Sequence, residues 1–157
     1  MREEFTFHSK EIVGAGGYLC PVAKSVVAAS YSEPMVDRDH YCGGYREYWT
    51  NVKGCETSTG DIEIHFVDSI NPGYFWIFPV SENVVNVGIG MVMSLLDKQK
   101  KKLKALQAEV IANHPMFKDR FAEAEMVPGS AKGWQLPFGS PRKKSKLNPR
   151  RSSMNGI

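Results

Sequence analysis

The sequence lacks the features that mark membrane, secreted and nucleic-acid-binding proteins. Its 157 residues contain no apolar run of the roughly 18 residues that a transmembrane helix needs. The first ten residues, MREEFTFHSK, are charged and lack the apolar centre of a signal peptide. The formal net charge of +3 is mild and does not by itself argue for nucleic-acid binding. We therefore expect a cytoplasmic protein, in contact with a membrane at most peripherally, and no nucleic-acid partner.

Cysteine is scarce as well, with three residues at Cys20, Cys42 and Cys55. An odd number of cysteines without a secretion signal argues against a disulfide framework. His40 and Cys42 could be combined with Cys55 and His65 as metal ligands, but their spacing fits no standard zinc pattern. The sequence thus predicts free thiols and no metal site.

Several segments alternate in the manner of β-strands, at residues 40–52, 61–68, 74–79 and 84–92. In the first, tyrosines fall on both faces, which fits a sheet with a core below and a binding cavity above, or a sheet edge. In the second, we expect the apolar residues Ile62, Ile64 and Phe66 to face the core and the polar residues Glu63 and His65 to face solvent. The turns between these segments favour an antiparallel sheet.

Helices are expected before and after these strands in the sequence. Residues 21–30 begin with a proline suited to a first helical turn, and a short strand is expected at 10–17. A single helix is predicted over 94–113, with apolar residues on one face at Leu96, Leu103, Leu106 and Val110. Its many lysines favour a solvated face, although anionic lipid or phosphate is an alternative partner. A short helix is expected from residue 116, and a strand near Trp134.

The most unusual stretch is GYFWIFPVSENVVNVGIG, which starts at Gly73. In a strand, Tyr74, Trp76 and Phe78 point one way, and on the next strand Gly88 and Gly90 share a face. Glycine inside a strand often marks a place where something approaches the backbone closely. Rings beside a bare backbone predict an apolar slot for an isoprenoid, a quinone or a flavin ring. The alternative is a well-packed hairpin whose glycines relieve crowding against the rings.

These residues form a motif that resembles a known family. Tyr-x-Trp-x-Phe-Pro, ending at Pro79, is followed after eight residues by Gly88-x-Gly90, and this resembles the signature of the geranylgeranyl reductase family. Its members are flavoproteins of the para-hydroxybenzoate hydroxylase type. The stretches DRDHYCGGYREYWTNV, IEIHFVDSINPGYFWIFPVSENVVNVGIGM and GWQLPFGS also resemble segments of that family, in the same order. The resemblance covers roughly residues 10–140.

The resemblance implies reduction of isolated carbon–carbon double bonds in a prenyl chain, with hydride from reduced FAD. NAD(P)H or another reductant would reduce the flavin in the intact enzyme. The implied substrate-binding residues are Tyr74, Trp76, Phe78, Pro79, Gly88 and Gly90. No catalytic residue is assigned, because Tyr74, His65 and Cys42 are all candidates for the proton donor by type.

The segment IVGAGGYLCPVAK resembles the end of the first half of the family's flavin domain. Gly14, Ala15 and Gly17 match the cofactor-binding positions, whereas Gly16 stands for the usual Asp and Cys20 for the usual Ser. The family's opening Gly-x-Gly-x-x-Gly and its later Gly-Asp-Ala-Ala-Gly-like motif do not occur. We therefore expect FAD at the family level and weak or absent FAD binding by this chain.

The predicted fold is α+β. We expect a remnant of an FAD-binding α/β domain at 1–35 and a substrate-binding domain at 36–140, made of an antiparallel sheet with helices on one face. A basic tail follows at 141–157. The chain would be a fragment of an FAD-dependent oxidoreductase that acts on a geranylgeranyl-type chain, and it is expected to be inactive alone. The alternatives are a non-enzymatic isoprenoid- or lipid-binding module and an inactive truncated fragment.

Overall fold

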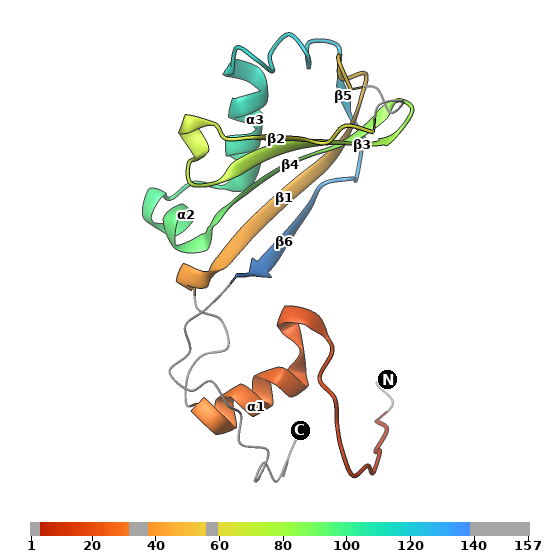
Figure 1. The fold of residues 1–157 in the computed structure, drawn as a ribbon, viewed down its shortest axis with the longest axis vertical. Helices are drawn as coiled ribbons and strands as arrows, with labels where there is room; N and C mark the ends of the chain where they lie inside the picture. Colours follow the sequence, from red (N-terminus) through yellow and green to blue (C-terminus); the bar gives the residue numbers. More distant parts are fainter. Residues whose placement is uncertain (1–3, 32–37, 56–59, 139–157) are drawn as a thin grey trace. The chain divides into compact units, whose positions relative to one another are not determined.

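The computed structural model describes residues 4–31, 38–55 and 60–138 (Figure 1). The chain divides into two units, and the second of them spans Val36–Ser140. Within the described ranges, no helix has the length and apolar character needed to cross a membrane. The basic tail expected at 141–157 lies outside the described residues.

The first unit contains one α-helix. The helix α1 runs over Pro21–Tyr31, directly after a 3-10 turn, η1, at Gly17–Leu19. The helix predicted from residue 21 is therefore correct, with its proline in the first turn. The strand predicted at 10–17 is wrong. Ile12 and Val13 are exposed there, and among the described residues no strand lies beside this segment to pair with it.

The second unit is built on a six-stranded antiparallel sheet. The sheet runs in the order β2, β3, β4, β1, and then both β5 and β6 pair with β1. The expected α+β fold with an antiparallel sheet is confirmed. The strands are β1 Tyr41–Thr50, β2 Glu63–His65, β3 Tyr74–Ser81, β4 Val84–Val92, β5 Glu125–Met126 and β6 Lys132–Pro137.

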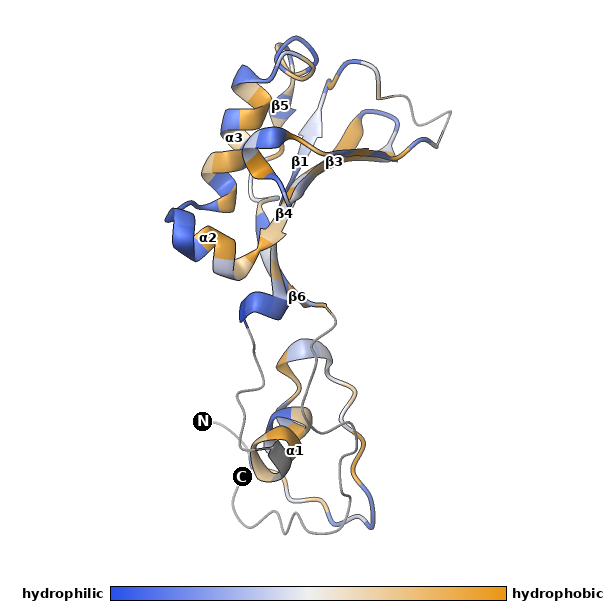
Figure 2. Ribbon diagram, turned by 60° about the vertical axis from the view of Figure 1, so that its left-hand side comes forward, coloured by the Kyte–Doolittle hydropathy of each residue, from blue (hydrophilic) through white to orange (hydrophobic). Residues whose placement is uncertain are grey.

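Two helices cover one face of this sheet (Figure 2). They are α2, Met93–Gln99, and α3, Leu103–Asn113, and short 3-10 turns at Arg38–His40 (η2) and Asp68–Ile70 (η3) connect other elements. The core lies between helices and sheet, where removal of each large apolar side chain from water stabilises the fold by about 1.5–3 kcal/mol. Its most deeply buried members include Phe75, Ile77, Val87, Ile89, Met91, Leu106 and Phe117.

The single helix predicted over 94–113 is in fact two helices. Lys100 adopts a left-handed conformation with φ of 52°, which ends α2. The break allows Leu96 and Leu103, on separate helices, both to pack over Gly43 of β1, where a Cβ would lie 3.5 Å and 3.1 Å from their Cδ1 atoms. The predicted apolar seam is confirmed, since Leu96, Leu106 and Val110 are buried.

The helix predicted from residue 116 is also absent, and turns occupy residues 115–120. The backbone carbonyl of Arg120 accepts a hydrogen bond from the amide of Lys53 at 3.0 Å. Its partner is therefore a distant segment and not the amide of a following helical turn. The strand expected near Trp134 is present as β6.

Strand β2 has the opposite orientation to the one predicted. Ile64 is 49% exposed, and its neighbours Ile62 and Phe66 are 65% and 81% exposed. Glu63 and His65 instead point to the helix side, where the ring of His65 meets that of Phe117 edge-on at 4.9 Å. Arg120, on the helix side, forms an ion pair with Glu63. This pair offsets the free-energy cost of burying a carboxylate.

Candidate functional site

The sheet face opposite the helices is the candidate site, and we call it the open face. In the described part of the second unit, no helix covers it (Figure 2). Tyr74, Trp76 and Phe78 of β3 lie side by side on it and form what we call the aromatic row. The ring centroids are 5.7 Å apart between Tyr74 and Trp76, and 6.0 Å apart between Trp76 and Phe78. The last two rings are nearly parallel, at 27°.

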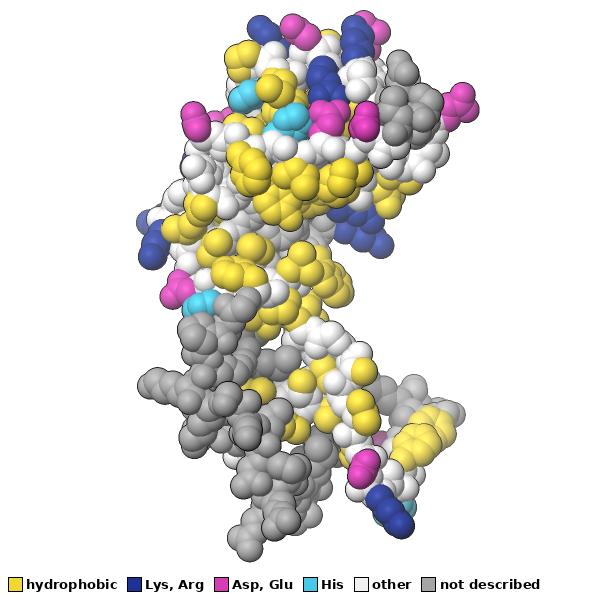
Figure 3. Space-filling view, viewed as in Figure 1, with side chains coloured by type: hydrophobic (Ala, Val, Ile, Leu, Met, Phe, Trp, Pro, Cys, Tyr) yellow, Lys and Arg dark blue, Asp and Glu magenta, His cyan; other side chains and the backbone are white. Residues whose placement is uncertain are grey.

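The aromatic row is accessible from outside. Tyr74 is 39% exposed, and Trp76 and Phe78 are half-buried. Their neighbours along the strand, Phe75 and Ile77, are fully buried in the core on the other face. In Figure 3, a band of apolar side chains crosses this side of the second unit. A hydrocarbon chain could therefore contact the rings without any opening of the core.

The slot predicted over the glycines is filled at one of its two positions. The indole of Trp76 lies on Gly88, where a Cβ would be only 2.0 Å from the ring atom Cζ2. The indole nitrogen donates a hydrogen bond to Oδ1 of Asn86 at 3.0 Å, which fixes the ring flat on the strand. At Gly90 the contacts are ordinary, with Trp76 Cζ3 at 3.7 Å. The alternative from the sequence, that glycine relieves crowding against a ring, is thus correct at Gly88.

The resulting surface is a flat platform rather than a slot. Because Gly88 has no side chain, the Trp76 ring lies directly on the sheet, and the outer face of the indole is available for contact. Pro79, at the end of the row, is half-buried, and β3 continues through it to Ser81. The strand tolerates a proline there because β2 pairs only with residues 75–77.

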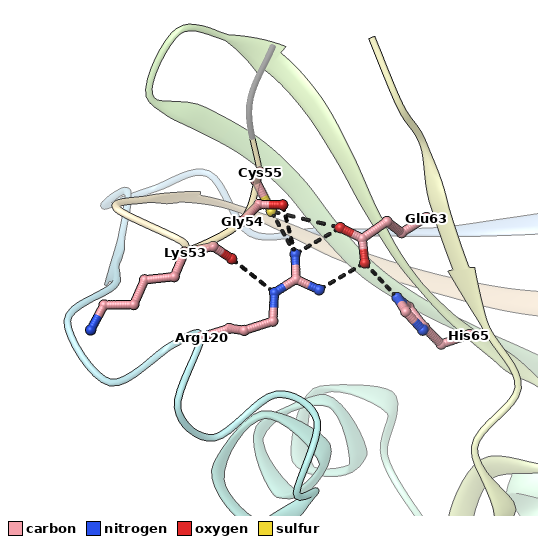
Figure 4. A network of polar contacts seen from close by, with 6 residues as sticks. All are labelled: Lys53, Gly54, Cys55, Glu63, His65 and Arg120. Carbon is pink, nitrogen blue, oxygen red and sulfur yellow. Dashed lines mark hydrogen bonds and ion pairs between the residues drawn. The ribbon is translucent and has the colours of Figure 1, made fainter. Parts of the chain in front are cut away.

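A polar network lies on the other side of the sheet (Figure 4). Arg120 donates to both carboxylate oxygens of Glu63, each at 2.7 Å, and to the sulfur of Cys55 at 3.0 Å. Glu63 also contacts Nε2 of His65 at 2.8 Å. The hydrogen bonds from Arg120 lower the pKa of Glu63, whereas burial raises the pKa of the Cys55 thiol. The network joins strand β2 to the turns after α3, which is a structural role.

The sequence matches a known catalytic domain, and the matching part includes the aromatic row. A profile of the geranylgeranyl reductase catalytic domain matches residues 40–129, a range that contains the strands β1 to β5. The chain belongs to the geranylgeranyl reductase family. The resemblance drawn from the aromatic motif and the glycine pair is thereby confirmed.

Curated relatives carry a related name. The digeranylgeranylglycerophospholipid reductases of Methanococcus vannielii and Methanococcus aeolicus are 27% and 28% identical to this chain, over 143 and 141 residues. The matches cover 91% and 90% of this chain but only 33% and 32% of those proteins. The chain therefore spans about a third of the length of these members of the geranylgeranyl reductase family.

Solved structures share the fold at low sequence identity. A geranylgeranyl bacteriochlorophyll reductase-like protein from Thermoplasma acidophilum superposes with a TM-score of 0.53 at 18% identity, covering 71% of this chain and 26% of that one. The flavin-dependent halogenase CmlS gives a TM-score of 0.51 at 17% identity, covering 79% and 21%. These two superpositions show that the chain shares its fold with parts of both proteins.

The three candidate proton donors lie in different places. Tyr74 is in the aromatic row, and Cys42 is on the open face of β1, where desolvation raises the pKa of its thiol. His65 belongs to the network on the helix side, and so the structure separates it from the platform of the geranylgeranyl reductase domain.

The glycine turn before α1 fits FAD only in part. At Gly14 a Cβ would lie 3.0 Å from Val22 Cβ and 3.1 Å from Cys20 Sγ, so the turn is packed against its own helix. Gly17, with φ of +68°, has no atom within 4 Å of its Cβ position, and Ala15 is exposed. Backbone hydrogen bonds, above all at Ala23, lower the pKa of the Cys20 thiol. The turn therefore leaves space for a ligand at Gly17 and none at Gly14.

Sequence reasoning missed three residues of the open face. Ile64 lies directly beside Trp76, and Arg46 and Lys132 face each other across β1 and β6. The alternation of β1 already placed Arg46 on the same face as Tyr48, which was an available signal. The sheet face on which Lys132 and Ile64 lie depends on strand pairing between distant segments, which the sequence pattern does not specify.

Proposed function

We propose that this chain supplies the substrate platform of an FAD-dependent oxidoreductase that reduces carbon–carbon double bonds of a prenyl chain. The observation that carries the proposal is the accessible aromatic row on a helix-free sheet face. Membership in the geranylgeranyl reductase family and the names of the curated relatives support a geranylgeranyl-type substrate. NAD(P)H or another reductant belongs to the same proposal.

The rings bind and orient the substrate by removing its apolar surface from water. Each methylene that leaves water contributes about 0.8 kcal/mol, and flat rings contact an extended hydrocarbon along its length. Trp76 is held in place by Gly88 below it and Asn86 beside it. Binding of a substrate therefore costs little conformational entropy of this side chain. When bound in the intact enzyme, reduced FAD supplies the hydride. The platform holds the double bond in position and removes one side of it from water.

The experiment is Trp76→Ala in a full-length relative that carries the same aromatic motif. Loss of the indole should lower turnover of a prenyl substrate at least about tenfold, because contacts of a large apolar side chain contribute about 1.5–3 kcal/mol and about 1.4 kcal/mol is tenfold in rate. The FAD content of the purified enzyme should stay unchanged. The control is an alanine substitution in the relative at the position equivalent to Met116, which in this chain is an exposed apolar residue in the turns after α3. Equal loss of turnover and bound FAD would contradict the proposal.

A second candidate is an isoprenoid-binding module without catalysis, and one observation favours it. At Gly14, one of the positions implied to bind FAD, the glycine turn before α1 is packed on Cys20 and Val22. Binding of a fluorescent prenyl probe to this chain, combined with no reduction by a full-length relative carrying the motif, would establish the binding module instead.

A further inference from the structure

Strand β2 forms one edge of the sheet in the second unit. It stands first in the sheet order, and among the strands that the structure describes it pairs with β3 alone, through residues 63–65. A strand at the edge of a sheet presents backbone N–H and C=O groups that can pair with another strand. In Figure 3, a row of acidic, basic and histidine side chains lies above the apolar band on this part of the unit.

The segment around β2 lacks the features that usually prevent pairing between sheet edges. Exposed edge strands commonly carry lysine, proline or a β-bulge. The stretch DIEIHFVD, residues 61–68, contains no lysine and no proline, and β2 pairs with β3 in a regular register. A charge that points into the protein can also oppose pairing, but Glu63 already forms an ion pair with Arg120 through two hydrogen bonds of 2.7 Å. This edge can therefore accept another β-strand.

Three apolar side chains are exposed together at this edge. Ile62, Ile64 and Phe66 alternate along the chain, and Phe66 is 81% exposed. Ile64 lies directly opposite Trp76 in the register, so the apolar surface of the open face continues from the aromatic row to the edge of the sheet. Single exposed apolar residues are ordinary, whereas a contiguous apolar patch marks a contact surface.

The sequence of this edge is complementary to itself. If a second copy pairs antiparallel about Ile64, the two Ile64 residues lie opposite each other, and Ile62 lies opposite Phe66 of the second copy. On the other face, Glu63 then lies opposite His65 of the second copy. A register centred on Glu63 would place two carboxylates opposite each other, and one centred on His65 would place two imidazoles there. Of these three registers, only the one about Ile64 sets an acid opposite an imidazole.

We propose that residues 62–66, which we call the edge segment, bind a second copy of this chain, so that the two sheets join across a two-fold axis at Ile64. A second copy fits because a two-fold contact needs a surface that complements itself, and the edge segment reads apolar, acidic, apolar, imidazole, apolar. The two aromatic rows then meet through the paired Ile64 side chains and form one apolar surface. The inference goes beyond the proposed function and does not depend on it.

The first test is sedimentation velocity of the 157-residue chain over a series of protein concentrations. The chain should pass from monomer to dimer as concentration rises, because a short edge segment forms a small and therefore weak interface. Phe66→Lys should weaken the dimer at least about tenfold, since pairing removes the Phe66 ring from water. Leu136→Lys is the matched control and should leave the dimer unchanged, because Leu136 is exposed on β6 at the opposite edge of the sheet.

Three outcomes of this measurement would overturn the proposal. A chain that stays monomeric at every concentration would leave the edge segment to a different partner chain or to the substrate. Equal weakening by Phe66→Lys and Leu136→Lys would show that two open faces stack rather than that two edges pair. Oligomers that grow beyond the dimer would also contradict it, because a two-fold contact uses both edge segments and leaves none for a third copy.

Cysteine cross-linking tests the register itself. Ile64→Cys should give a disulfide-linked dimer under mild oxidation, because directly opposite Cα atoms in antiparallel strands lie about 4.5–5.5 Å apart, within the range of a disulfide. Phe66→Cys is the matched control, since its two copies would lie four residues apart along the paired strands, about 14 Å, and should not cross-link. The parent chain gives the background from its three native cysteines. Equal cross-linking of the two variants, or none above background at Ile64→Cys, would overturn the register.

Discussion

At the scale of single residues, the position of the Trp76 ring depends on the absence of a side chain beneath it. A Cβ on Gly88 would lie 2.0 Å from Cζ2, which the packed indole cannot accommodate without moving. Gly88→Ala should therefore destabilise the protein by about 1–3 kcal/mol, the usual cost of overpacking, as measured by urea unfolding. Gly90→Ala is the control, because its Cβ would meet Trp76 at an ordinary 3.7 Å. Equal effects of the two substitutions would contradict this packing.

The Glu63 carboxylate should give the protein a distinct acid sensitivity. Arg120 lowers its pKa below the ordinary value of 4.5, so the stabilisation is present above that pH and is lost as pH falls through the lowered value. Glu63→Gln should cost about 1–3 kcal/mol of unfolding free energy at pH 7, and the difference should shrink below about pH 4. The measurement is the unfolding free energy of both proteins across that pH range.

Glu123→Gln is the matched control for this measurement. Glu123 pairs with Lys53 at 2.8 Å, but both side chains are largely exposed, so its removal should leave stability unchanged. A difference between Glu63→Gln and the parent that stays constant down to pH 2 would show that the carboxylate charge is not the cause.

The residues of β2 show why a pattern alone can place a strand the wrong way round. Alternation correctly separated Ile64 from Glu63, but it could not tell which set faces the core. That choice depends on Arg120, which lies 57 residues later and pairs with Glu63. By contrast, the shared face of the aromatic row was predictable, because alternation places Phe75 and Ile77 on the opposite face, where both are buried in the core.

At the scale of elements, the break between α2 and α3 depends on one strained residue. A lysine in the left-handed region costs about 1–2 kcal/mol relative to glycine, which adopts it freely. Lys100→Gly should therefore raise the unfolding free energy by up to about 1 kcal/mol. Ala108→Gly, within α3, should lower it by about the same amount. Destabilisation by both substitutions in thermal unfolding would contradict the left-handed turn.

The helix break was hidden in the sequence for a physical reason. Leu96 and Leu103 are seven residues apart, which places them on one face of a continuous helix as well as on two separate ones. Glycine, the usual signal of a left-handed helix end, is absent at this turn. The hairpin predicted at 74–79 and 84–92 is present as β3 at 74–81 and β4 at 84–92, because its turn residues and its alternation agree.

At the scale of the whole molecule, this chain spans about a third of its curated relatives and matches the family profile over the sheet unit. At Gly14 and Gly16 its glycine turn is packed against Cys20 and Val22. The purified chain should therefore contain far less than one flavin per molecule, which the absorbance near 450 nm measures. A yellow preparation with FAD in near-equal amount would contradict the expectation that the segment IVGAGGYLCPVAK binds FAD weakly or not at all.

The most direct test of the platform uses the three tryptophans of the chain. Trp76 and Trp134 lie on the open face, while Trp49 lies on the helix side and donates its indole N–H to Glu47 at 3.1 Å. The measurement is the set of indole N–H signals in nitrogen-15 NMR spectra during titration with geranylgeraniol. The account predicts a saturable shift of the Trp76 signal and a stationary Trp49 signal. A stationary Trp76 signal, or an equal shift of Trp49, would contradict it.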